Sequence, residues 1–211
     1  WVLSDEVPVT NSNVFVFGTP GQGKSGTTKA FLTRMLDFGY RVLILGDTKD
    51  EYEKLCHAVG VEPFVVGPGM GTRVNPLDFG PLGYQWDKLD GPAAQARAAV
   101  IFKRWLTLLR GLVGSQHIGD RRVPFGPTDE VVTKTALTHI TGYAAGCTRL
   151  TELTIPQLWW ALDNPTPDLI ATCRYRDERH FLDETRLLRD ALGQLVSGAL
   201  AGLFDGHTTV K

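Results

Sequence analysis

The feature that most constrains the fold of this chain is the glycine-rich motif GTPGQGKS at residues 18–25. It fills the pattern G-x-x-x-x-G-K-S/T and directly follows the apolar run VFVF at residues 14–17. The pattern requires a buried strand, a glycine-rich turn and then a helix whose free N–H groups face an anion. We therefore expect residues 18–25 to surround the phosphate groups of a nucleotide. The alternative is an accidental glycine-rich turn.

Each residue type in this motif has a chemical reason. Gly21 and Gly23 lack a Cβ, so the backbone can take positive φ and turn its amides toward the α- and β-phosphates. Lys24 supplies a mobile charge to the β- and γ-phosphates, and the Ser25 hydroxyl is placed to ligate Mg²⁺. The predicted nucleotide-binding residues are Thr19, Pro20, Gly21, Gln22, Gly23, Lys24, Ser25 and Gly26.

Composition restricts the partners of the chain more than its chemistry. A chain of 211 residues with 43% hydrophobic residues can bury one substantial core, with room for an appended subdomain. The net charge of -1 provides no overall field for nucleic acid or an anionic membrane. Cys56, Cys147 and Cys173 are odd in number and far apart, which predicts neither a disulfide framework nor a zinc site and favours a reducing cytosol.

The two ends of the sequence suggest a piece of a longer protein. The chain begins at Trp1 without a Met and stops abruptly at Lys211. Its first residues lack the basic region of a signal peptide, and no apolar run approaches the ~20 residues that span a bilayer. We therefore expect an excised, cytoplasmic segment.

The first part of the chain alternates apolar strands with amphipathic helices. Short apolar runs at residues 14–17, 41–45 and 64–66 predict strands, and residues 28–38 and 51–59 predict the helices between them. This order is typical of an α/β fold with a doubly wound parallel sheet, whose ligand lies at the carboxyl ends of the strands.

Beyond about residue 90 the pattern changes to long helices without a clear strand. Helices are predicted at residues 92–112, 128–143, 155–162, from residue 167, and at 183–200. We interpret this block as an insertion into the α/β domain. The predicted domains are residues 1–90 as the first part of a nucleotide-binding core, 91–200 as the helical insertion and 201–211 as the segment returning to the core.

The helical block does not have the charge of a nucleic-acid-binding surface. Between residues 92 and 200 there are thirteen Lys or Arg residues against eleven Asp or Glu residues. Trp159 and Trp160 could stack on bases, but an aromatic pair at helical spacing more often belongs to a core. We expect both tryptophans in the core.

Acidic residues follow the second predicted strand. Asp47 and Glu51 lie just beyond its carboxyl end, at the sheet edge that carries the glycine-rich loop. An acid there can hold Mg²⁺ through water or polarise an attacking water. We predict catalytic roles for Lys24 and Glu51 and a water-mediated Mg²⁺ contact for Asp47; the alternative is that both acids cap the next helix. The motif N-P-L-D at residues 75–78 has no mechanism that its letters reveal.

Together these motifs resemble a known family. The loop preceded by Asn13, the strand ending in D-x-K-x-E-Y at residues 47–52, the G-P-G at 67–69 and the N-P-L-D at 75–78 closely resemble the VirB-type conjugal-transfer ATPases of type IV secretion systems, especially their actinobacterial relatives, within the FtsK/HerA superfamily. The last stretch, residues 188–208, looks like the family's segment after its helical insertion. One departure is Asp50, where the family usually has Gly.

The resemblance implies more than the residues themselves show. It implies a P-loop NTPase with a RecA-like parallel sheet, incomplete in this chain, and a large all-α insertion. It also implies ATP and Mg²⁺ as cofactors, a homo-hexameric ring and a position at the cytoplasmic face of the membrane, against the proteins of the secretion channel. The implied function is ATP hydrolysis that powers type IV secretion or conjugative transfer.

Such ATPases also need an apolar strand that ends in an Asp-Glu pair. Candidates at Asp47, at Asp163 and at Asp183 with Glu184 fail, because the first is interrupted by a glycine and the others lie in predicted helices. The family would place this pair beyond Lys211, and no arginine finger can be assigned. We therefore expect nucleotide binding without turnover from these residues alone.

Three other functions fit the loop. An FtsK-like or coupling-protein DNA translocase would need a basic pore, which the charge does not support. A nucleotide-gated binding module such as a GTPase switch would need the guanine-reading motif N-K-x-D, which the sequence lacks. A small-molecule kinase would use the helical block as an arginine-rich lid.

Overall fold

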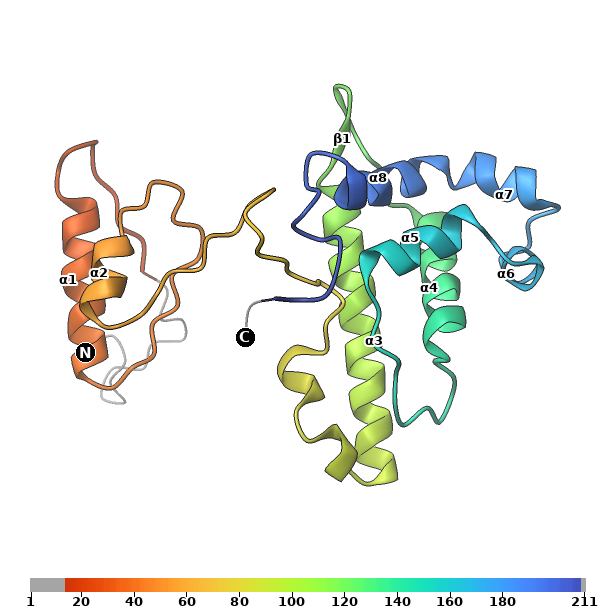
Figure 1. The fold of residues 1–211 in the computed structure, drawn as a ribbon, viewed down its shortest axis with the longest axis horizontal. Coiled ribbons are helices and arrows are strands. Elements are labelled where there is room, and N and C mark those ends of the chain that lie inside the picture. Colours follow the sequence, from red (N-terminus) through yellow and green to blue (C-terminus); the bar gives the residue numbers. More distant parts are fainter. Residues whose placement is uncertain (1–13, 210–211) are drawn as a thin grey trace. The chain divides into compact units, whose positions relative to one another are not determined.

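The computed structural model describes residues 14–209, which are mainly helical. The chain divides into two compact units, Trp1–Pro63 and Phe64–Lys211 (Figure 1). Asn13, one of the residues that carry the family resemblance, lies outside the described part. No helix among the described residues is long and apolar enough to cross a membrane.

The first unit contains α1 (Lys24–Asp37) and α2 (Glu53–Ala58). Helix α1 begins inside the glycine-rich motif, four residues before the predicted start at residue 28. It ends where Gly39 takes a φ of 81° and donates its N–H to the Leu36 carbonyl at 2.8 Å. Only glycine adopts this left-handed conformation at little cost, so Gly39 terminates the helix.

The prediction of a parallel sheet is wrong. Residues 14–17, 41–45 and 64–66 form no strand, and the one sheet in residues 14–209 is a short antiparallel hairpin in the second unit. Most apolar side chains of the three segments are exposed, for example 88% of Phe17 and 82% of Leu45, and Val42 and Ile44 are half-buried. A strand is stabilised by its neighbours, and these apolar runs do not pair with one another within the described residues.

The second unit is built from helices (Figure 1). Its elements are the short 3-10 helices η1 (Gly80–Gly83) and η2 (Trp86–Lys88), then α3 (Gly91–Gly114), α4 (Pro127–Thr141), α5 (Ile155–Asp163), α6 (Pro167–Thr172), α7 (Glu178–Glu184) and α8 (Arg186–Ser197). The predicted helices at residues 92–112, 128–143, 155–162 and from residue 167 are confirmed within a few residues.

The helix predicted at residues 183–200 is confirmed as α8, which is three residues shorter at each end. Helix α7 precedes it, and the break between the two falls at Thr185. The buried Thr185 hydroxyl donates to the Phe181 carbonyl at 2.7 Å, and that carbonyl also accepts from the Thr185 N–H at 3.0 Å. A threonine that bonds back to the preceding turn often bends a helix.

Local capping explains where several helices start. Asp90 accepts a hydrogen bond from the Ala93 N–H at 2.9 Å and is followed by Pro92 in the first turn of α3. At the start of α5, the Thr154 N–H donates to the Gln157 side chain at 2.9 Å. These contacts satisfy N–H groups that a helix leaves free at its beginning.

The core of the second unit lies where α5 packs on both α4 and α8 and where α3 packs on α4. Trp105, Leu158 and Leu192 are fully buried in it. The expectation for the tryptophan pair is half wrong, because Trp159 is half-buried whereas 62% of Trp160 is exposed. Neighbouring positions on a helix point 100° apart, and here Trp159 faces Gly193 of α8 whereas Trp160 lies on the outer side of α5.

A hairpin interrupts the helical block, which was expected to contain no strand. Strands β1 (His117–Ile118) and β2 (Arg121–Arg122) pair antiparallel, with Ile118 opposite Arg121. Gly119 takes a φ of 61° in the two-residue turn between them. Figure 1 shows the hairpin extending past the end of α3.

The segments that enter and leave the helical unit lie beside each other. The Val74 N–H donates to the Leu203 carbonyl at 2.8 Å, and the Thr209 N–H donates to the Arg73 carbonyl at 3.1 Å. The Arg73 guanidinium pairs with Asp205 at 2.9 Å. We call residues 73–75 and 203–209 the clasp.

Candidate functional site

The glycine-rich loop has the backbone conformation that the motif predicts. Gly21 and Gly23 have φ values of 80° and 76°, and Gly23 is the residue that precedes α1. Within the described residues no side chain caps α1, and its first turn contains no acidic residue. The N–H groups at the start of α1 therefore remain available to an anion, and the helix dipole favours negative charge there.

Lys24 lies back across its own loop. Its Nζ donates to the Gly18 carbonyl and to the Thr19 carbonyl, each at 2.7 Å. A Cβ on Gly18 would lie only 3.2 Å from the Lys24 Cγ, so a side chain there would crowd the lysine. The ammonium group is thus held at the loop by neutral acceptors that a phosphate oxygen can replace.

A cavity of about 420 Å³ lies beside the loop, within the first unit. Ser25, Thr28 and Leu32 of α1 form one side of it, and residues 43–49 with Glu51 and Tyr52 form the other. The structure therefore brings Ser25, Asp47 and Glu51 to one cavity, although the sheet expected to place them there is not formed. Their proximity depends on the turn at residues 46–52.

Asp47 is engaged by the backbone of that turn. Its Oδ2 accepts from the Tyr52 N–H at 2.8 Å, and its Oδ1 accepts from the Glu51 N–H at 3.1 Å. The Tyr52 bond is the main reason that the pKa of Asp47 lies below its usual range. Burial acts in the opposite direction, and the weaker effects of the bonds from Glu51 and Lys49 and of the Lys29 charge also lower the pKa.

Glu51 differs from Asp47 in its surroundings. It is half-buried at the cavity wall and forms no ion pair within residues 14–209. Beside it, the Lys29 ammonium lies 5.4 Å from the centre of the Tyr52 ring, a cation–π contact that links α1 to the turn. Of the two predicted acids, Glu51 is therefore the one whose carboxylate is available in the cavity.

The oxygen atoms in this cavity could serve as ligands of a magnesium ion that arrives with a nucleotide. The Ser25 hydroxyl and the Glu51 carboxylate supply oxygen atoms, which Mg²⁺ prefers. Among the described residues no group of three or more His, Cys, Asp or Glu could hold a metal by itself. Mg²⁺ usually keeps several waters and takes its other ligands from phosphate oxygens, so one hydroxyl and a nearby carboxylate are an adequate set.

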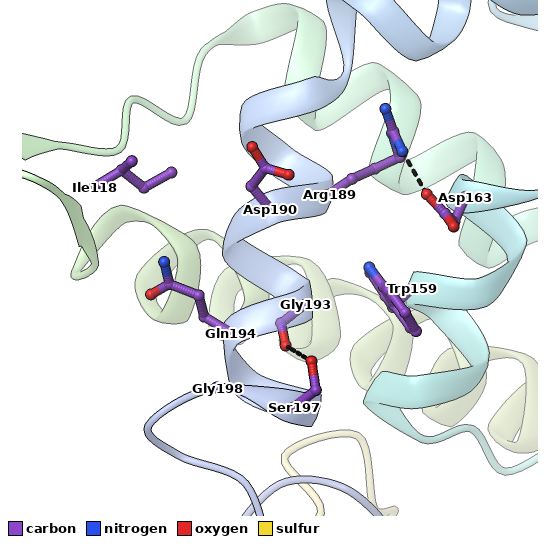
Figure 2. Close-up of a pocket in the computed structure, with 9 residues that line it drawn as sticks. All are labelled: Ile118, Trp159, Asp163, Arg189, Asp190, Gly193, Gln194, Ser197 and Gly198. Carbon is purple, nitrogen blue, oxygen red and sulfur yellow. Dashed lines mark hydrogen bonds and ion pairs between the residues drawn. The ribbon is translucent and has the colours of Figure 1, made fainter.

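A second cleft lies between α5 and α8 in the second unit, with a volume of about 360 Å³ (Figure 2). Asp163 pairs there with Arg189, whose guanidinium also donates to the Leu182 carbonyl at 2.8 Å. Asp190 lies 3.6 Å from the Arg186 Nε. The charged groups of this cleft are matched inside the chain, which makes it a weaker candidate than the loop cavity.

Two acidic sites that the sequence analysis rejected, Asp163 and the pair Asp183 and Glu184, lie in helices. Asp163 is the last residue of α5 and is bound to an arginine. Asp183 and Glu184 lie in α7, where Asp183 is 4.0 Å from the Arg179 Nε. Both sites belong to helices of the second unit, but Asp183 and Glu184 end α7, whereas the sequence analysis placed them at the start of the last helix.

Comparisons of the chain with protein-family models, with curated proteins and with solved structures found no match.

Proposed function

We propose that residues 19–26 bind the phosphate groups of ATP together with Mg²⁺, and that the chain is the nucleotide-binding portion of a motor ATPase. The observation that carries the first part is the loop itself. Two glycines at positive φ lead into an uncapped 14-residue helix, and the Lys24 ammonium lies across the loop on two carbonyl oxygens. Each of these features is suited to an anion.

When a nucleotide binds, the Lys24 ammonium would donate to phosphate oxygens in place of the backbone carbonyls that it contacts in the free loop. The ammonium leaves the carbonyls of Gly18 and Thr19 for the β- and γ-phosphates, where a charged acceptor makes a stronger hydrogen bond. The N–H groups at the start of α1 take the remaining phosphate oxygens. Because all these groups belong to residues 18–26, binding does not depend on distant parts of the chain.

Ser25 and Glu51 would act on the metal side of the phosphates. When bound, Mg²⁺ neutralises charge on the β- and γ-phosphates. The Ser25 hydroxyl would ligate the ion, and the Glu51 carboxylate, across the same cavity, would accept hydrogen bonds from water next to it. An acid in this place also polarises an attacking water, which supports a contribution of Glu51 to turnover.

The wider role depends on the family resemblance of the sequence. It supports ATP hydrolysis that powers type IV secretion or conjugative transfer, by a homo-hexameric ring at the cytoplasmic face of the membrane, in contact with secretion-channel proteins. The net charge of -1 does not favour nucleic acid as a direct partner.

The proposal is tested by Lys24→Ala. Loss of a charge-assisted phosphate contact costs roughly 1.5 to 3 kcal/mol, so the affinity for a fluorescent ATP analogue should fall by about tenfold to more than a hundredfold. Lys54→Ala is the matched control, because it removes the same charge from the exposed surface of α2. Equal affinities of wild type and Lys24→Ala would refute the assignment.

A further inference from the structure

The turn at residues 46–52 is organised around one side chain. Gly46 and Asp50 take φ values of 73° and 53°, and the Thr48 N–H donates to the Gly46 carbonyl at 3.0 Å. A positive φ is uncommon outside glycine, although Asp and Asn tolerate it better than other residues. The tight path of the chain therefore needs support, and the hydrogen bonds to Asp47 provide it.

Both carboxylate oxygens of Asp47 take part in this support. Its Oδ1 accepts from the Glu51 N–H at 3.1 Å and from the Lys49 N–H at 3.4 Å. Its Oδ2 accepts from the Tyr52 N–H at 2.8 Å. These contacts fix the backbone on both sides of the Glu51 Cα. Asp47 therefore determines where the Glu51 side chain starts, and its own oxygens point to the backbone.

We propose that Asp47 is a positioning residue, which holds Glu51 at the wall of the cavity that Ser25 shares, and that it does not itself contact Mg²⁺ or its water. The role of Glu51 toward Mg²⁺ rests on the proposed function, whereas the positioning of the Glu51 backbone by Asp47 does not depend on it. It reassigns the metal contact predicted for Asp47 to Glu51. The two acids of the D-x-K-x-E-Y motif then have different roles: the first shapes the turn and the second faces the ligand.

Comparing Asp47→Asn with Asp47→Ala separates geometry from charge. The asparagine oxygen can still accept a backbone N–H, whereas alanine has no acceptor. If Asp47 positions the turn, amide hydrogen exchange at Glu51 and Tyr52 should accelerate by about tenfold in Asp47→Ala, the effect of one lost hydrogen bond, and clearly less in Asp47→Asn. Asp50→Asn is the control. It removes the charge of another carboxylate in the same turn, and the Asp50 carboxylate forms no ion pair within the described residues.

The second measurement is the gain in affinity for a fluorescent ATP analogue when Mg²⁺ is added. Asp47→Ala and Glu51→Gln should each reduce this gain, and the double variant should be no worse than Glu51→Gln, because Asp47 acts only through Glu51. Additive losses, or an Asp47→Asn variant as defective as Asp47→Ala, would show that Asp47 acts by its charge on the ion and would overturn the proposal.

The two measurements also distinguish this inference from the proposed function. A wild-type chain that fails to bind the analogue, with or without Mg²⁺, contradicts the proposed function. Exchange at Glu51 and Tyr52 that is unchanged in Asp47→Ala contradicts the positioning role, whatever the nucleotide result.

Discussion

Asn75 shows how one buried residue connects distant parts of the second unit. Only 4% of it is exposed. Its Nδ2 donates to the Leu153 carbonyl at 2.8 Å, its Oδ1 accepts from the Leu77 N–H at 3.1 Å, and its own N–H donates to the Thr208 hydroxyl at 3.0 Å. The N-P-L-D motif revealed no mechanism in the sequence because two of these partners are 78 and 133 residues away.

Replacing Asn75 by alanine should destabilise the protein. The change leaves the Leu153 carbonyl and the Leu77 N–H without these partners in the interior, and a buried unsatisfied group costs about 1 to 3 kcal/mol. Urea unfolding measures the effect. Asn164→Ala is the control, because Asn164 is exposed and donates only to the Trp160 carbonyl. Similar midpoints for the two variants would argue against a role of Asn75 in the fold.

At the level of elements, the helices could be predicted and the strands could not. Periodicity and caps are local, so Asp90 and Thr154 mark the starts of α3 and α5 in the sequence itself. The turn residues Gly119 and Asp120 were a usable signal for the missed hairpin. The runs at residues 14–17 and 41–45 have strand composition, but pairing depends on neighbours that the local sequence does not specify.

Helix α8 allows a direct test of how the second unit is held together. Leu192 is fully buried against the core, whereas 48% of Leu187 on the same helix is exposed. Truncating a buried leucine to alanine costs about 2 to 5 kcal/mol, because apolar contacts are lost and a cavity remains. Leu192→Ala should therefore lower the thermal midpoint by many degrees, and Leu187→Ala should change it little. A larger effect of Leu187→Ala would contradict the packing described for α5 and α8.

For the whole molecule, burial is distributed unequally between the two units. Every buried hydrophobic residue among the described ones lies in the second unit, and no side chain in residues 14–63 is buried. The candidate site was predictable because the glycine-rich loop, Asp47 and Glu51 lie within a short stretch of sequence. The clasp was not predictable, and the parallel sheet was predicted wrongly, since both depend on contacts between distant residues.

The uneven burial predicts that backbone amides of the two units exchange their hydrogens at different rates. Few buried contacts mean a low free energy of local opening, so the amides of α1 should exchange far faster than those of α3, which contains the fully buried Trp105.

ATP with Mg²⁺ should then protect α1 selectively. A ligand at about 100 times its Kd stabilises the state that binds it by about 2.7 kcal/mol, so exchange in residues 18–37 should slow by up to about a hundredfold, while α3 stays unchanged. Lys24→Ala should lose this protection, because the loop then lacks its charge. Exchange measured by mass spectrometry with and without the nucleotide decides the matter. If the amides of α1 are already as protected as those of α3 in the free protein, the prediction is wrong. The first unit would then be stable without a ligand, despite its lack of buried side chains.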